Sequence, residues 1–183
     1  VGEQPYIKAN EKYFSVAIQG GGGPFTVVPL DQPGAIPLNQ PYFNGHTGAV
    51  LDFEFNPFHS QIISTSSDDT TVKVWGIPEE GLKENINEPL MTLQGHHKKV
   101  VLLKHHPTAS NALLSASSDL SVKLWDIESG GELHSFEECG DLIQDIAWDT
   151  NGNQFAVSSK DKCIRFVDAR SNCVAAKKDM AHD

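Results

Sequence analysis

The chain has 183 residues, 39% of them hydrophobic and 8% aromatic, with a formal net charge of −10. These values are typical of a soluble globular chain of about one domain, and they exclude a disordered segment. No run of about 18 apolar residues occurs, so no membrane-spanning helix is expected. The acidic balance, without a stripe of Lys and Arg among aromatic residues, argues against a nucleic-acid partner.

The start of the chain and its cysteines argue against secretion. The first residues carry no basic region followed by an apolar core and no initiator Met, so we expect a piece of a longer protein. The three cysteines, Cys139, Cys163 and Cys173, are too few and too scattered for a disulfide framework or a paired-cysteine zinc site. We therefore expect reduced thiols in an intracellular protein.

Short strands separated by turn residues follow one another along the chain. Apolar runs at 13–18 and 25–30 flank the glycine run 20–23, and residues 50–55 alternate apolar and polar side chains as a half-buried strand does. Further predicted strands lie at 61–65, 71–75, 90–93, 100–104, 113–116, 122–125, 132–136, 142–148 and 164–168. No long amphipathic helix is predicted between them.

Two stretches repeat one pattern of residues. The first runs from Gly45-His46 to Trp75 and the second from Gly95-His96 to Trp125; in both, the His precedes the Trp by 29 residues and an Asp precedes it by six. A Gly-His start and a Trp-Asp finish at fixed spacing resemble the blades of WD-repeat propellers. The sequence therefore predicts an all-β fold, a fragment of a WD-repeat β-propeller built of four-stranded antiparallel blades, which presents loops and edges to partners.

We interpret the whole chain, 1–183, as one partial propeller. A third copy of the repeat is present, but it lacks some of the repeated residues. In that copy Val167 stands where the Trp would be, and Cys139 stands near the position of the His. The predicted units are a partial early blade at 1–40, a first clear repeat at 41–93, a second at 94–137, a degenerate repeat at 138–178 and the start of a next blade at 179–183.

The repeated residues predict a hydrogen-bonded network inside each blade, because buried polar groups must be paired. The members expected are His46, Asp69 and Trp75 with Thr65 or Ser67 in the first repeat, His96, Asp119 and Trp125 with Ser115 or Ser117 in the second, and Asp161 in the third turn. Ser, His and Asp together also resemble a hydrolase triad. Their recurrence in each intact blade beside a Trp favours an architectural role, so no catalytic residue is assigned.

Other candidate sites are weaker. The pairs His96-His97 and His105-His106, with Cys139 as a soft ligand, are residue types that bind metal ions, but adjacent histidines match no zinc signature. A metal enzyme stays as a rival hypothesis that elemental analysis would test. The glycine run lacks the Lys-Ser/Thr of a phosphate loop. We expect no cofactor.

Beyond the generic repeat, the chain resembles the coronins, the actin-binding WD-repeat family. The resemblance covers nearly all of the chain, and the residues that carry it lie at 14–18, 25–30, 45–46, 50–52, 55–58, 69–78, 106–109, 111, 159–162 and 167–170.

The resemblance implies a seven-bladed propeller, usually followed by a linker and a C-terminal coiled coil, that binds filamentous actin. It also implies regulation of actin turnover, partly through the complex that nucleates branched actin. On this basis we expect a non-catalytic regulator of the actin cytoskeleton in the cytoplasm and at the cell cortex. In coronins a basic N-terminal segment with an actin-contacting arginine opens the chain, and it would precede Val1.

Actin is acidic, so local basic residues would have to make any contact with it. The candidates are Lys73, Lys98, Lys99 and Lys123. The rival from another class is a WD-repeat scaffold subunit of a different complex. An open half-ring also exposes blade edges, so we expect the chain to pair with itself, to be completed by further sequence or to be poorly soluble.

Overall fold

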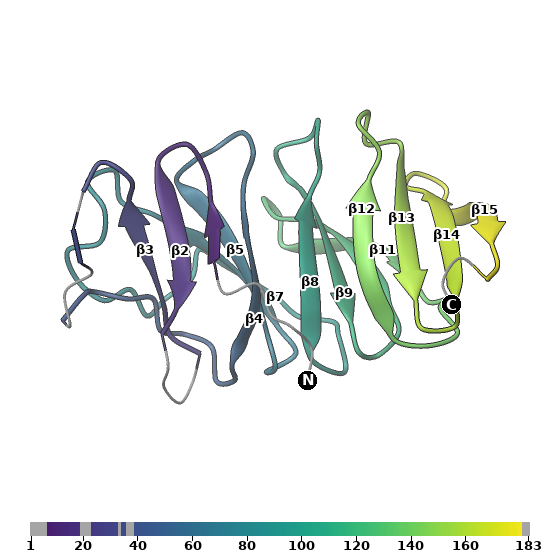
Figure 1. Ribbon diagram of the computed structural model, residues 1–183, viewed down its shortest axis with the longest axis horizontal. Helices are drawn as coiled ribbons and strands as arrows, with labels where there is room; N and C mark the ends of the chain where they lie inside the picture. Colours follow the sequence, from purple (N-terminus) through teal and green to yellow (C-terminus); the bar gives the residue numbers. More distant parts are fainter. Residues whose placement is uncertain (1–6, 19–22, 33, 36–38, 181–183) are drawn as a thin grey trace.

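The computed structural model describes residues 7–18, 23–32, 34–35 and 39–180 and shows a row of β-sheets standing side by side (Figure 1). Every regular element among these residues is a strand, and all strand pairs within the sheets are antiparallel. Three sheets have four strands and one has three. The predicted all-β architecture is confirmed.

Each sheet is a meander, in which strands pair in the order in which they follow along the chain. The first sheet holds β1 (Ile7–Ala9), β2 (Tyr13–Ala17) and β3 (Phe25–Pro29); the second β4 (Val50–Phe55), β5 (Ile62–Ser67), β6 (Val72–Gly76) and β7 (Met91–Leu93); the third β8 (Val100–His105), β9 (Ala112–Ser117), β10 (Val122–Asp126) and β11 (Gly131–Phe136); the fourth β12 (Ile143–Trp148), β13 (Gln154–Ser159), β14 (Cys163–Asp168) and β15 (Cys173–Lys178).

The first sheet has no regular fourth strand among the described residues. In the first sheet, the place of a fourth strand is taken by Phe43, which forms one antiparallel bridge with Phe25 and one parallel bridge with Ile86. The predicted opening of a further blade at 181–183 and most of the glycine run at 20–22 lie outside the described residues.

The hydrophobic core lies in the layers between successive sheets. Between the first and second sheets, the rings of Phe25 and Phe43 stack with centroids 4.6 Å apart, and both meet Trp75 edge-on. Trp125 lies in the next layer, and Phe155 lies in the layer after that. The first strands β1, β4, β8 and β12 contact one another in turn along the row. Because both faces of the inner sheets are covered, strands such as β5 and β9 are buried along nearly their whole length, with small Ser and Thr side chains among the apolar ones.

A polar contact repeats at three successive boundaries between sheets. The Asn10 side chain donates from Nδ2 to the Ser60 carbonyl, Asn56 donates in the same way to Ser110, and His106 contacts the Gly152 carbonyl through Nε2. In each case the acceptor atom of the same side chain caps its own turn by accepting two backbone N–H groups. We call this contact the turn clasp; it ties each first-to-second-strand turn to the next one.

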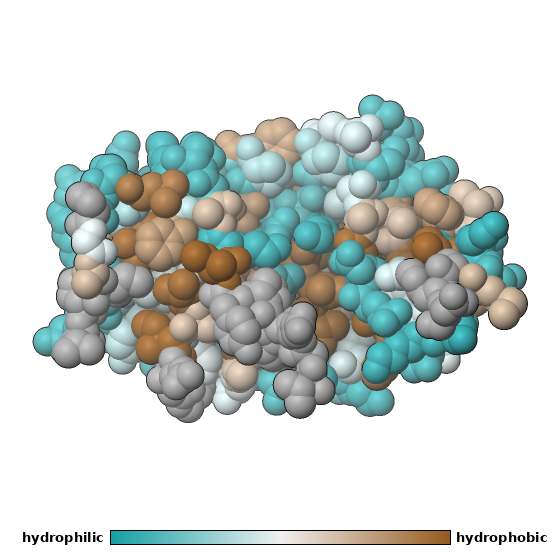
Figure 2. Space-filling model, viewed as in Figure 1, coloured by the Kyte–Doolittle hydropathy of each residue, from teal (hydrophilic) through white to brown (hydrophobic). Residues whose placement is uncertain are grey.

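The last sheet presents an uncovered face. Phe166 is 40% exposed, whereas Val74 and Leu124 at the equivalent strand position are 3% and 9% exposed because a following sheet covers them. Polar groups cover much of the side shown in Figure 2, and apolar groups gather over the first sheet at the left. Within the described residues no helix is present that has the length and hydrophobicity to cross a membrane.

Candidate functional site

The first blade network forms where the loop entering the second sheet meets the turn between β5 and β6. The His46 ring lies 2.8 Å from Asp69 Oδ2 through Nδ1 and 2.8 Å from Thr65 Oγ1 through Nε2, and Trp75 Nε1 donates to the same hydroxyl at 2.9 Å. The sequence left Thr65 and Ser67 open, and the structure selects Thr65. Ser67 instead accepts the backbone N–H of Asp69.

The donors and acceptors of this network fit a neutral imidazole. Trp75 can only donate, so the Thr65 hydroxyl accepts from it. The Thr65 proton then goes to His46 Nε2 at 2.8 Å rather than to the Lys73 carbonyl at 3.5 Å, because the shorter contact is the stronger one. Nδ1–H then faces the Asp69 carboxylate. Burial alone would raise the pKa of Asp69, but hydrogen bonds from His46 and Thr71 outweigh burial and hold that pKa well below its usual range. The loop and the turn are thereby locked together.

The second network repeats the first with serine in place of threonine. His96 lies 3.0 Å from Asp119 through Nδ1 and 2.8 Å from Ser115 Oγ through Nε2, and Trp125 Nε1 donates to Ser115 at 2.8 Å. Burial lowers the pKa of His96 against the opposing effect of the Asp119 carboxylate, which agrees with a neutral ring. Ser117, the alternative considered from sequence, bonds the Lys98 carbonyl.

The connectivity of Ser115, His96 and Asp119 is that of a hydrolase triad, but its environment differs. Ser115 is 0% exposed, and its hydroxyl oxygen accepts the Trp125 N–H. A nucleophile needs access to substrate and an oxyanion site beside it. The geometry therefore supports the architectural role of these residues.

In the fourth sheet, Arg165 takes the place of the His and Trp as the partner of the turn Asp and of the strand hydroxyl. Arg165 reaches the Asp161 carboxylate at 2.6 Å from Nη2 and at 3.3 Å from Nη1, and Nη1 also donates to Ser159 at 3.0 Å. The Arg165 hydrogen bonds hold the pKa of Asp161 well below its usual range. Sequence reasoning found Asp161 and missed Arg165 and Ser159. The available signal was that Arg165 occupies the position of Lys73 and Lys123, two residues before the Trp position.

The place of Cys139 follows from a backbone contact that all three repeats share. The Asp of the turn accepts the N–H of Thr47, of His97 and of Gly140, each of which follows the first network residue. Cys139 therefore stands at the position of His46 and His96, as predicted. Burial raises the pKa of its thiol to about 11, so the side chain is a protonated apolar filler.

The four candidate lysines have unlike surroundings. Lys98 and Lys99 are exposed on the loop that follows His96. Lys73 is half-buried and donates to Thr92. The expectation that Lys123 faces a partner needs correction: its side chain is 7% exposed, and its ammonium pairs with Glu132 at 2.9 Å and bonds Ser135. Burial of the side chain along the sheet and the ion pair with Glu132 make Lys123 a poor contact residue.

Antiparallel strands place the loops of each sheet alternately at two opposite edges. We call the edge that carries the network histidines the His edge; it comprises residues 44–49, 68–71, 94–99, 118–121, 138–142 and 160–162. The opposite edge comprises residues 10–12, 30–32, 56–61, 77–90, 106–111, 126–130, 149–153 and 169–172, and we call it the acidic edge because it carries nine Asp and Glu residues against three Lys and Arg. Charge is therefore distributed unevenly between the two edges.

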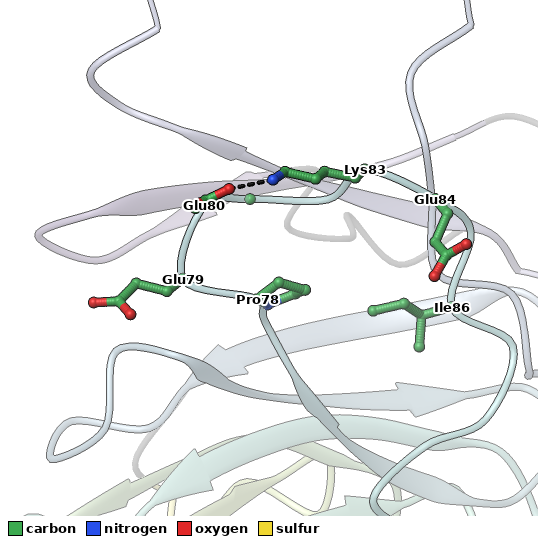
Figure 3. A pocket seen from close by; sticks show the side chains of 7 residues that line it. Pro78, Glu79, Glu80, Lys83, Glu84 and Ile86 are labelled. Carbon is green, nitrogen blue, oxygen red and sulfur yellow. Dashed lines mark hydrogen bonds and ion pairs between the residues drawn. The ribbon is translucent and has the colours of Figure 1, made fainter.

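A pocket of about 440 Å³ lies on the long loop between β6 and β7 (Figure 3). Pro78 and Ile86 line it together with acidic side chains, and Lys83 on its rim pairs with Glu80. The carboxylates are solvated at the surface, so the pocket encloses no defined ligand set. Across the part of the chain that the structure describes, no group of three or more His, Cys, Asp or Glu side chains is arranged to hold a metal ion.

Comparison with known proteins identifies the repeats. A model described as "WD domain, G-beta repeat" matches residues 38–76, 87–126 and 130–168, and one described as "Domain of unknown function (DUF1899)" matches residues 1–35. Coronin-A of Dictyostelium discoideum is 48% identical over 170 residues, which are 92% of this chain and 38% of that protein. The chain thus spans less than half the length of this curated relative.

A solved structure supports the same relationship. The crystal structure of the WD40 domain from Toxoplasma gondii coronin matches 96% of this chain and 45% of that one, with a TM-score of 0.90 and 29% sequence identity. The resemblance to coronins predicted from the sequence is confirmed at the level of both sequence and fold. The chain belongs to the WD40 repeat family, and within that family it is similar to the coronins.

Proposed function

We propose that this chain is part of a non-catalytic cytoskeletal regulator that binds filamentous actin through its propeller. The observation that carries the proposal is the similarity to Coronin-A, which extends over 92% of the chain. By the same resemblance the protein works in the cytoplasm, at the actin-rich cortex. Contact with the complex that nucleates branched actin would involve regions outside this chain. The buried Ser-His-Asp connectivity supports a structural rather than a catalytic use of these residues.

The His edge carries four lysines beside six Asp and Glu residues, so attraction to an acidic filament would have to act locally, at the lysine clusters. Its exposed lysines come from two neighbouring sheets: Lys98 and Lys99 from the loop entering the third, and Lys160 and Lys162 from the β13–β14 turn of the fourth. The loop is fixed by His96 and the turn by Asp161, so the ammonium groups project from rigid supports. Lys73 and Lys123 contribute less because their Nζ atoms already have side-chain partners.

Co-sedimentation with filamentous actin tests this proposal. The double change Lys98→Glu and Lys99→Glu should reduce pelleting severalfold at low salt, and the remaining binding should weaken further as salt screens the lysines of the fourth sheet. The matched control is Lys12→Glu with Arg170→Glu, which makes the same change in charge at exposed positions away from the His edge. Equal loss in both double variants would reject the His edge as the actin surface.

Failure of the unmodified chain to pellet at low salt would count against direct actin binding by this part of the protein. The rival, a scaffold subunit of another complex, would then be favoured. A version extended to the full propeller, run beside this chain, separates the two results: pelleting of the extended protein alone would place the actin contact outside residues 1–183.

A further inference from the structure

A groove of about 450 Å³ opens on the acidic edge between the second and third sheets. Its apolar lining comes from Ile62, Val74 and Met91 of the second sheet and from Ile127, which follows β10 of the third, and its polar lining includes Asn56, Ser110 and Asn111. Leu90 stands at the lip with 64% of its surface exposed. A large exposed aliphatic side chain beside a depression with apolar and polar lining is typical of interaction sites.

Defined contacts fix the position of the two sheets on either side of the groove. Gly130 has a φ of 74°, and a Cβ at this position would lie 2.6 Å from Met91 Sδ, so the glycine lets the third sheet approach β7 closely. At the other end, Asn56 of the turn clasp donates to the Ser110 carbonyl and fixes the two turns relative to each other. The groove is therefore a preformed feature of the sheet boundary.

The charges around the groove have one sign. Glu128 is exposed on the wall from the third sheet, next to Asp126. On the other side, Glu88 is exposed two residues before Leu90, whereas Glu79, Glu80 and Glu84 of the same loop line the separate pocket of Figure 3. His59 also lines the groove. An occupant with an apolar group next to positive charges would pack that group in the groove and place its charges near the carboxylates.

We propose that this groove docks an extended basic peptide segment of a partner protein, with one branched apolar side chain against Leu90 and Met91 and flanking Lys or Arg residues facing Glu128 and Glu88. This site goes beyond the proposed actin contact, because it lies at the opposite ends of the strands from Lys98 and Lys99. It gives the propeller a second partner surface of opposite charge preference.

Fluorescence anisotropy with a labelled peptide tests the groove. The probe is Lys-Lys-Ser-Leu-Ser-Lys-Lys, and the two control peptides replace either the leucine by serine or every lysine by glutamate. We expect the probe to bind with an affinity that falls with salt, the serine peptide to bind roughly tenfold more weakly through loss of the apolar contact, and the glutamate peptide not to bind.

Protein variants locate the binding. Leu90→Ser should weaken the probe roughly tenfold, whereas Leu133→Ser, at a leucine that is 51% exposed on β11 and does not line the groove, should leave it unchanged. Glu128→Gln should flatten the salt dependence, whereas Glu138→Gln on the His edge should not. Actin pelleting should be the same for Leu90→Ser as for the unmodified chain, which keeps this test separate from the proposed actin function.

The proposal is overturned if the probe and the serine peptide bind equally, because binding would then be unspecific attraction of charge. It is also overturned if Leu133→Ser weakens the probe as much as Leu90→Ser, or if no binding is detected at ~1 mM peptide, the weak limit of specific recognition. Leu90 is largely exposed, so Leu90→Ser should fold normally, and circular dichroism checks this directly.

Discussion

Arg165 holds Asp161 in a two-point contact, with 2.6 Å between Nη2 and Oδ2, at the place in the fourth sheet where the other repeats use a His and a Trp. The partner of the turn Asp thus comes from strand β14 rather than from the entering loop. The turn Asp still ties its turn to the entering loop, because in each repeat its carboxylate also accepts a backbone N–H of that loop.

Replacing Arg165 by Met should destabilise the chain by about 2–4 kcal/mol, because Asp161 and Ser159 lose a buried charged partner. Urea unfolding followed by circular dichroism measures the change. Arg170→Met is the control, since Arg170 is exposed and its loss should change the free energy of unfolding by less than about 0.5 kcal/mol. Similar effects of the two changes would show that the Asp161–Arg165 pair is not structural.

The hydroxyl of Thr65 can be separated from its methyl group. Thr65→Val keeps the shape but leaves His46 and Trp75 without their shared partner, and should cost about 1–3 kcal/mol of the free energy of unfolding. Thr65→Ser keeps the hydroxyl, as Ser115 does in the next repeat, and should cost about 1 kcal/mol or less through the lost methyl group. Thermal unfolding of both variants distinguishes a polar network from packing alone; a larger cost for serine than for valine would reject the network.

Acid should destabilise the blades through Asp69 and Asp119. Both carboxyls have pKa values in the folded chain that lie below their ordinary value, because hydrogen bonds outweigh burial. The stabilisation is fully present above the unfolded pKa of about 4 and is lost as the pH falls from there through the lower folded values. Urea midpoints measured between pH 7 and pH 2 should therefore fall below about pH 4. The double variant Asp69→Asn and Asp119→Asn should show a shallower fall.

Asp52 should act in the opposite direction. Its side chain is buried between β4 and β8, where it accepts the N–H groups of Phe53 and Leu103, and burial raises its pKa to about 6 against the opposing effect of Lys8. Between about pH 4 and pH 6 the unfolded carboxyl ionises while the folded one keeps its proton, so stability falls as the pH rises.

The change Asp52→Asn removes this titration. The free energy of unfolding of the variant minus that of the unmodified chain should rise by about 2–3 kcal/mol from pH 4 to pH 7. This trend holds even if the variant is the less stable protein at every pH. Asp31→Asn, at an exposed carboxyl, should show no such trend in the same urea titrations. A difference independent of pH would mean that Asp52 is not protonated in the folded chain at pH 5.

The turn clasp can be tested with an amide-to-acid change. Asn56→Asp keeps the oxygen that caps its own turn but loses the Nδ2–H that reaches Ser110, and should cost about 1–3 kcal/mol of the free energy of unfolding. Asp149→Asn makes the reverse change at a residue whose carboxylate caps Gln154, and should be nearly neutral. Hydrogen exchange of the β4–β5 and β8–β9 turns measures the loosening directly, and unchanged exchange in Asn56→Asp would refute the clasp.

The uncovered face of the last sheet should drive association. Phe166 is 40% exposed on this face, so light scattering of the chain at high concentration should give a mass above that of one copy. Phe166→Ser should reduce the association, whereas Leu30→Ser, at the other end of the row, should not. A monodisperse single copy at high concentration would contradict this expectation.

Much of the blade network was predictable because the same residue types occur at the same spacing in two repeats. His46, Asp69 and Trp75 recur at identical spacing as His96, Asp119 and Trp125, and buried polar groups at fixed spacing must meet. Thr65 and Ser67 could not be separated in this way, since residues two apart on a strand lie on the same face. The registers of β5 and β6 decide between them by pairing Ile63 with Trp75, which brings the indole to Thr65.

The sequence by itself determined the class of fold, the positions of the repeats and the resemblance to coronins, because each depends on residue types at set intervals along the chain. Only the tertiary structure decided that Arg165 takes over the role of the missing His and Trp, that Lys123 is paired with Glu132 and that Asn56 ties one sheet to the next. These contacts depend on which side chains face each other across a strand pair or a sheet boundary, and spacing along one chain does not contain those distances.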